Sequence, residues 1–170
     1  MFETAFERVF DNEGEFQNSS HDRGNWTSGT IGIGDLLGTK YGISAMSYPH
    51  LDIENLTLVD AREIYKRDWW DALAMESFRP AIQYQMFDAA INHGMHRATL
   101  FLQHAINTKA DGVIGPKTKK AAFKMNLNDI LMNFLAERLI FMTDISSWEV
   151  FGKGWARRIA HNLKHAAEDN

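Results

Sequence analysis

Apolar residues recur with the period of an α-helix along most of this chain, and one long stretch, residues 14–56, breaks that period. A helix over residues 2–13 that stops at Gly14 is predicted by the first apolar stripe, which comprises Phe2, Ala5, Phe6, Val9 and Phe10. The helical period returns at Thr57 and continues to the C-terminus. The sequence therefore predicts a mainly α fold with one irregular segment.

The irregular segment carries most of the turn-forming residues of the chain. Two short alternating pieces, Gly29 to Gly34 and Lys40 to Ser44, are predicted to pair as a small β-hairpin near residues 27–45. A loop of this length inside a compact domain is usually functional. We therefore expect the functional site to lie beside it.

Helix signals are clear after the irregular segment. Thr57 and Asp60 resemble a capping box, with Asp in place of Glu, opening a helix that runs through Trp69 and Trp70. Further helices are predicted over residues 80–93 and 97–107, from Pro116 to Phe123, from an Asn128 cap through Phe141, and from Gly154 to the end. We expect the helix capped by Asn128 to be the central buried one.

Composition excludes several classes of protein. The chain has 170 residues and no cysteine, which removes disulfide scaffolds, thiol nucleophiles and Cys-ligated zinc. No run of 18 apolar residues and no N-terminal apolar segment occurs, so we expect a soluble, cytoplasmically made monomer without a transmembrane helix or signal peptide. A net charge of -4 argues against general nucleic-acid binding.

Charge is unevenly distributed along the chain. Residues 1–108 hold 8 Lys and Arg against 15 Asp and Glu, whereas residues 109–170 hold 10 against 7. In the last helix, Trp155, Ile159 and Leu163 form an apolar stripe, and most cations lie on the other side: Arg157, Arg158, His161, Lys164 and His165. Either this basic face is merely solvated, or it contacts an anionic cell envelope.

Two carboxylates suggest glycosidase chemistry. Glu13 ends the first helix, where apolar neighbours would raise its pKa as a general acid requires, and Asp22 follows in a polar turn. Spacing alone is weak evidence, and Glu15 competes with Glu13 for the role of acid. His93 and His96 lack a third ligand at a recognisable spacing, so we predict no metal site and no cofactor.

Several motifs occur in the order found in a known family: Glu13-Gly14-Glu15-Phe16, Asp22-Arg23-Gly24-Asn25, Thr39-Lys40-Tyr41-Gly42-Ile43-Ser44, Phe87-Asp88-Ala89-Ala90-Ile91-Asn92-His93-Gly94 and Asp111-Gly112-Val113-Ile114-Gly115-Pro116. Together they resemble the phage and bacterial muramidases of glycoside hydrolase family 108. The resemblance implies a single lysozyme-like domain over 1–170, with the catalytic helix and loops in 1–78. The rest, 79–170, would form a helical lobe that includes a predicted peptidoglycan-binding region.

The resemblance also implies roles for single residues. The catalytic glutamate of the family falls on Glu13, with Asp22 as its partner. Residues inserted between Asn25 and Thr39 leave the catalytic threonine open among Thr27, Thr30 and Thr39, of which we favour Thr39. Tyr41, Thr27 and Asn92 are expected to bind substrate.

Three functions follow for the chain. The first is a muramidase that hydrolyses the β-1,4 bond between N-acetylmuramic acid and N-acetylglucosamine, as in a phage endolysin released from the host cytoplasm to the cell wall by a separate pore-forming protein. The second is a lytic transglycosylase, which would use one glutamate and form an anhydro-sugar. The third is a non-catalytic peptidoglycan-binding module, resting on the stretch from Asp111 to Pro116.

Overall fold

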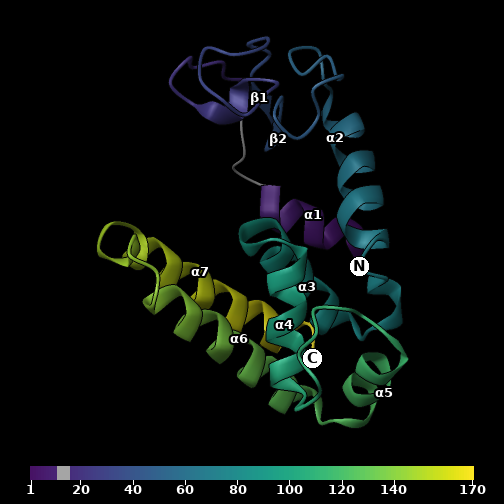
Figure 1. Cartoon of the computed structure of the whole chain (residues 1–170). Helices are drawn as coiled ribbons and strands as arrows, with labels where there is room; N and C mark the ends of the chain where they lie inside the picture. Colours follow the sequence, from purple (N-terminus) through teal and green to yellow (C-terminus); the bar gives the residue numbers. More distant parts are fainter. Residues whose placement is uncertain (11–15) are drawn as a thin grey trace. The chain divides into compact units, whose positions relative to one another are not determined.

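A computed structural model describes residues 1–10 and 16–170 of the chain. It forms two compact units, Phe6–Arg67 and Met1–Ala5 with Asp68–Asn170. Helices dominate the chain and a two-stranded antiparallel sheet is the small β element (Figure 1). The mainly α architecture predicted from the apolar period is confirmed.

The unit Phe6–Arg67 holds the β element and α2 (Leu58–Tyr65). β1 (Thr39–Lys40) pairs with β2 (Ile43–Ser44) across a tight turn, with Thr39 opposite Ser44. The helix α1 (Phe2–Phe10) begins in the other unit and ends here. Its Phe6 and Phe10 rings lie 6.0 and 4.4 Å from the ring of Tyr65, which closes a small aromatic core.

The hairpin lies in the predicted region, but the predicted pairing is wrong. Lys40 to Ser44 forms the turn and most of both strands by itself, and Gly29 to Gly34 contributes no strand. Gly29, Gly32 and Gly34 all have positive φ, which breaks an extended path. Ile31 and Ile33 stay more than half exposed, so their alternation does not mark a buried strand face.

The capping box at the start of α2 is confirmed. The Thr57 Oγ1 accepts a hydrogen bond from the Asp60 backbone N–H, and the Asp60 carboxylate accepts one from the Thr57 N–H. The predicted continuation through Trp69 and Trp70 differs in form: α2 ends at Tyr65 and the chain continues as a π-helical segment, η2 (Lys66–Asp71).

The larger unit contains the remaining helices: the short 3₁₀ turn η3 (Met75–Ser77), α3 (Pro80–His93), α4 (Met95–Ala105), α5 (Pro116–Lys124), α6 (Leu127–Thr143) and α7 (Trp148–Glu168). α4 packs on α3 and α6, and α6 runs beside α7 (Figure 1). Phe2, Trp70 and Phe87 meet edge to face at 5.3 to 5.9 Å in its core. Trp70 is thus a core residue.

Some predicted boundaries and roles of these helices are wrong. The cap of α6 is Asn126, whose Oδ1 accepts from the Asn128 backbone N–H, and α7 begins at Trp148 and not near Gly154. The most buried helix is α3, in which every residue from Ala81 to Ala90 is buried. Gly154 lies inside α7 and does not start it, because a glycine within a helix lowers the helix propensity without ending the helix.

The apolar stripe of α7 is also partly wrong. Ile159 is buried, but Leu163 is 40% exposed and Asn162 takes the buried position beside it. Arg158 does not belong to a free basic face, because its Nη1 lies 2.7 Å from the buried Asp88 carboxylate. The lysines and arginines that remain on the exposed surface of this helix are Lys153, Arg157 and Lys164.

Candidate active site

The loop before β1 brings Asp22 and Thr39 into one hydrogen-bonded network. Asp22 caps the short 3₁₀ helix η1 (Arg23–Asn25), with its Oδ1 accepting from the Gly24 N–H at 2.8 Å. Its Oδ2 accepts from Gln17 Nε2 at 3.2 Å. The same Gln17 amide pairs with Asn25, and Asn25 Oδ1 accepts from the Thr39 hydroxyl at 2.7 Å.

The backbone holds this network from both sides. Gln17 and Thr39 form an antiparallel bridge with N···O distances of 2.9 and 2.8 Å. The Asn25 carbonyl accepts from the N–H groups of Leu37 and Gly38, so the chain returns to its starting point after the inserted residues. Residues 26–36 therefore form a loop that is closed at its base, and Thr39 lies beside the residues around Asp22.

The other two threonines are held within the inserted loop. Thr27 Oγ1 accepts from the Asp35 N–H at 3.0 Å, and its backbone N–H donates to the Asp35 carbonyl. Thr30 is exposed and its backbone atoms bond to the Ser28 hydroxyl. Among Thr27, Thr30 and Thr39, only Thr39 hydrogen-bonds into the Asp22 network of the described residues.

Tyr41 occupies the tip of the hairpin. Its φ of 51° and the φ of 73° at Gly42 give the left-handed pair that tight hairpin turns need. The Tyr65 hydroxyl donates to the Tyr41 carbonyl at 3.1 Å, and Lys40 Nζ lies 5.6 Å from the centre of the Tyr41 ring. The ring is half-buried, so one part of it is available to a ligand.

Glu13 and Glu15, between which the sequence left the general acid open, lie outside the described residues. Asn92, predicted to bind substrate, is not part of the Asp22 network. It lies on α3 in the larger unit, and its side-chain amide donates to the Asp88 carbonyl at 2.7 Å.

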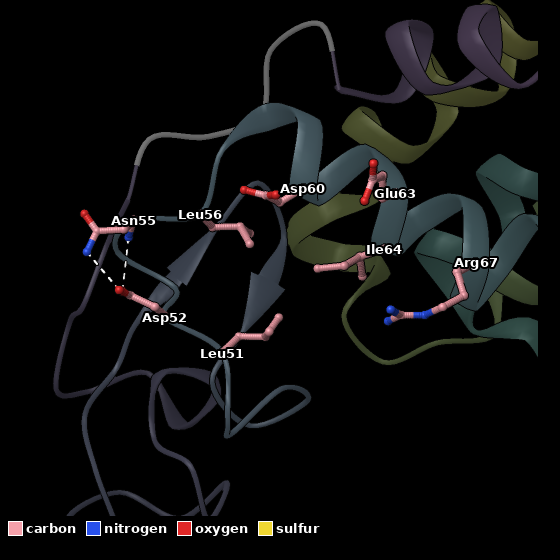
Figure 2. A pocket seen from close by; sticks show the side chains of 8 residues that line it. All are labelled: Leu51, Asp52, Asn55, Leu56, Asp60, Glu63, Ile64 and Arg67. Carbon is pink, nitrogen blue, oxygen red and sulfur yellow. Dashed lines mark hydrogen bonds between the residues drawn. The ribbon is translucent and has the colours of Figure 1, made fainter.

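A pocket of about 370 Å³ lies against α2 in the smaller unit (Figure 2). Its wall combines apolar and charged side chains: Leu51, Asp52, Asn55, Leu56, Asp60, Glu63, Ile64 and Arg67. Two of its carboxylates already accept hydrogen bonds from neighbouring residues. The side chain and backbone of Asn55 lower the pKa of Asp52, and the side chain and backbone of Thr57 lower the pKa of Asp60. None of the predicted site residues lines this pocket.

A buried polar hub in the larger unit was missed by the sequence reasoning. The Asp88 carboxylate accepts from Arg138 Nη2 at 2.8 Å, Arg158 Nη1 at 2.7 Å and Asn162 Nδ2 at 2.7 Å. Burial alone would raise the pKa of Asp88, but the two guanidinium groups and Asn162 outweigh it and hold that pKa below its usual value. The hub joins α3, α6 and α7.

His93, one of the two histidines considered above as metal ligands, lies beside a buried arginine. His93 Nε2 lies 3.4 Å from Arg138 Nη2, and burial together with the Arg138 charge lowers the pKa of His93 to about 4. Within residues 1–10 and 16–170, no three His, Cys, Asp or Glu side chains gather as a metal ion would require. No helix in that part of the chain is long and apolar enough to cross a membrane.

Comparison with known proteins decides the family. Residues 6–94, more than half of the chain, match the family described as Glycosyl hydrolase 108. The chain belongs to glycosyl hydrolase family 108. It is therefore a glycoside hydrolase, and the match includes Asp22, Thr39 and the hairpin.

The structure of Brucella abortus SagA is similar to this member of family 108. The two share 27% sequence identity and a TM-score of 0.80, over 99% of this chain and 94% of SagA. This likeness agrees with the lysozyme-like fold that the sequence resemblance implied. No curated protein matches the chain. Family and fold together support the hydrolysis of peptidoglycan.

Proposed function

We propose that this family 108 enzyme is an N-acetylmuramidase that cleaves the β-1,4 bond between N-acetylmuramic acid and N-acetylglucosamine. The observation that carries the proposal is the network that joins Asp22 to Thr39 inside the stretch matched by the family. A carboxylate and a hydroxyl held together in this way can stabilise a cationic sugar and orient a water molecule.

In the proposed reaction, Glu13 protonates the oxygen that leaves as the bond to the sugar C1 breaks. Asp22 stabilises the positive charge that develops on the ring, and Thr39 orients the water whose oxygen bonds to C1. One proton of the water stays on the new C1 hydroxyl. The other goes to Glu13 if the configuration at C1 is retained, and to Asp22 if it is inverted. Tyr41, Thr27 and Asn92 are proposed to bind the glycan strand.

Substitution of Glu13 tests the assignment of the acid. Glu13→Gln keeps the shape of the side chain but cannot donate the proton, so we expect turnover to fall by about two to four decades. Glu15→Gln is the matched control and should keep most of the activity. The release of soluble fragments from purified peptidoglycan measures both variants. Loss of activity in Glu15→Gln alone would move the acid to Glu15.

The products distinguish the proposed hydrolase from a lytic transglycosylase. Hydrolysis adds one water to each cleaved strand, whereas a transglycosylase forms an anhydro-sugar that lacks it. Mass spectrometry of the released fragments separates the two, and anhydro ends throughout the products would replace muramidase by transglycosylase. Membership of a hydrolase family argues against the non-catalytic binding module.

The cellular role is part of the same proposal. An endolysin made in the host cytoplasm would reach peptidoglycan only after a separate protein opens the membrane. Exposed cations on α7, chiefly Arg157 and Lys164, are proposed to contact anionic groups of the cell envelope. Arg158 is not included, because it pairs with Asp88.

A further inference from the structure

The side chains of Gln17 and Asn25 form a closed pair of amides between the two proposed catalytic groups. Gln17 Oε1 accepts from Asn25 Nδ2 at 2.8 Å, and Gln17 Nε2 donates to Asn25 Oδ1 at 3.1 Å. Asn25 has 0% of its surface exposed, whereas Gln17 is exposed. The sequence pattern did not single out Gln17, and Asn25 appeared only as the last residue of the Asp22 motif, without a role of its own.

The orientation of the Asn25 amide follows from its neighbours. The Ser19 carbonyl, which can only accept, receives a hydrogen bond from Asn25 Nδ2 at 3.0 Å. The other end of the amide is therefore the carbonyl oxygen, and Thr39 Oγ1 must donate its single proton to it. With that proton engaged, the Thr39 hydroxyl can act toward any further group only as an acceptor.

Asp22 is fixed from the other end of the pair. One Nε2 proton of Gln17 goes to Asn25 and the other to Asp22 Oδ2, while the Gly24 N–H binds Oδ1. Among residues 1–10 and 16–170, each carboxylate oxygen thus has one donor and keeps capacity for another partner.

We infer that Gln17 and Asn25 are positioning residues, which fix the Asp22 carboxylate and orient the Thr39 hydroxyl to accept a hydrogen bond from the water that adds to the sugar. This inference rests on the proposed function for the roles of Asp22 and Thr39. The amide pair itself touches no reacting atom and acts only through these two side chains.

Replacement of Gln17 by Glu tests the contact with Asp22. The introduced carboxylate faces Asp22 without a proton to donate, so turnover near neutral pH should fall by about ten- to hundredfold. Two adjacent carboxylates take up a shared proton more readily than an isolated one, which restores a donor as the pH is lowered. The activity of Gln17→Glu as a fraction of wild type should therefore rise toward acidic pH.

Asn18→Asp is the matched control, because Asn18 is the exposed neighbour and the change adds the same charge. Its activity relative to wild type should stay constant over the same pH range. A constant fraction for Gln17→Glu as well would overturn the positioning role of Gln17.

A double substitution tests the contact with Thr39. If Asn25 acts in part through Thr39, the loss of kcat in Asn25→Ala combined with Thr39→Val should be smaller than the product of the two single losses, with KM little changed. Losses that multiply would overturn the inference. Should Asn25→Ala fail to fold, Thr39→Ser decides: it keeps the donated proton and should retain most of the kcat that Thr39→Val loses.

A measurement without substrate separates this inference from the proposed function. The side-chain amide NMR signals of Gln17 should shift as Asp22 is titrated, and this shift should vanish in Asp22→Asn. Absence of the shift in the wild type overturns the amide network even in an active muramidase. Its presence in a chain that cleaves no peptidoglycan supports the network and refutes only the proposed function.

Discussion

Removal of the charge on Asp88 should destabilise the larger unit more than any surface substitution. Asp88→Asn keeps the volume and one acceptor oxygen, but the fully buried Arg138 loses its counter-charge. The new amide N–H₂ would also face donors, because the side chains of Arg138, Arg158 and Asn162 all donate to the carboxylate, as does that of Asn92 at 3.4 Å. Breaking a buried ion pair from one side costs about 3 to 5 kcal/mol, and the retained oxygen places Asp88→Asn near the lower end.

The contribution of Arg158 should be smaller. Its side chain is 36% exposed, so solvent screens its attraction to Asp88 and can hydrate the carboxylate when it is removed. We expect about 1 kcal/mol for Arg158→Met. The order of the two losses follows from burial and not from distance, since both N···O distances are nearly equal, at 2.8 and 2.7 Å.

Urea unfolding near neutral pH measures both losses as differences in the free energy of unfolding. Asp144→Asn, at the exposed end of α6, makes the same chemical change without a buried partner and should stay within about 0.5 kcal/mol of wild type. If Asp88→Asn lost no more than Asp144→Asn or Arg158→Met, the claim that Arg138 depends on this carboxylate would be refuted.

The effect of Asp88 should also depend on pH. Its pKa is lowered in the folded chain from the ordinary value of 3.8, so the unfolded chain binds this proton first as the pH falls. The stabilisation is therefore complete above that value and is lost as the pH drops through the folded pKa. The gap between wild type and Asp88→Asn should narrow only below pH 3.8.

Three further outcomes are expected. The pKa of His93 falls from 6.5 to about 4 on folding, so the unfolded chain takes up this proton first as the pH is lowered. The free energy of unfolding of the wild type should therefore drop between these two pH values. In urea titrations, His93→Gln should show a smaller drop. Gly42→Ala should lower the free energy of unfolding by about 1 to 3 kcal/mol in the same assay. The φ of Gly42 is 73°, and a Cβ there would lie 2.6 Å from the Tyr65 hydroxyl oxygen. An unchanged free energy of unfolding would contradict that geometry. Charge reversal at the exposed Arg157 and Lys164 should weaken sedimentation of the protein with cell walls at low salt but not at high salt. The melting temperature should not change. If the variant bound as well as wild type at every salt concentration, these two side chains would be merely solvated.

Local signals in the sequence were read correctly where the deciding interactions are also local. The Thr57 capping box and the proline at the start of α5 need only neighbouring residues. The hairpin was misassigned because alternation in a glycine-rich piece does not reveal whether a second surface covers it. Alternation predicts a strand only when one face is buried.

The hub at Asp88 could not be predicted from its neighbours. Arg138, Arg158 and Asn162 are distant in sequence, and their convergence depends on how α3, α6 and α7 pack. A signal did exist, since an acidic residue within a continuous apolar run needs a buried partner. That signal indicates that Asp88 has a cationic partner, but it does not identify the residue.

The candidate site shows the same division. Thr39 was preferred over Thr27 on family resemblance and stays a prediction; in the structure the Thr39 hydroxyl donates to Asn25, whereas Thr27 Oγ1 accepts from the Asp35 N–H. Gln17 and Asn25 were missed because an amide side chain has no distinctive spacing. Their importance depends on the path by which the inserted residues return to Asn25.

That return path separates the length of the inserted loop from the geometry of the site. Trp26 and Leu36 bridge across its base, and the Asn25 carbonyl binds the N–H groups on which the loop ends. None of these closing bonds uses residues 28–34, so we expect a change in the length or sequence of that segment to leave Asp22 and Thr39 in place. Exposed positions such as Ile31 and Ile33 can thus change, in evolution or by design, while the hydrogen-bonded network of Asp22 and Thr39 stays intact.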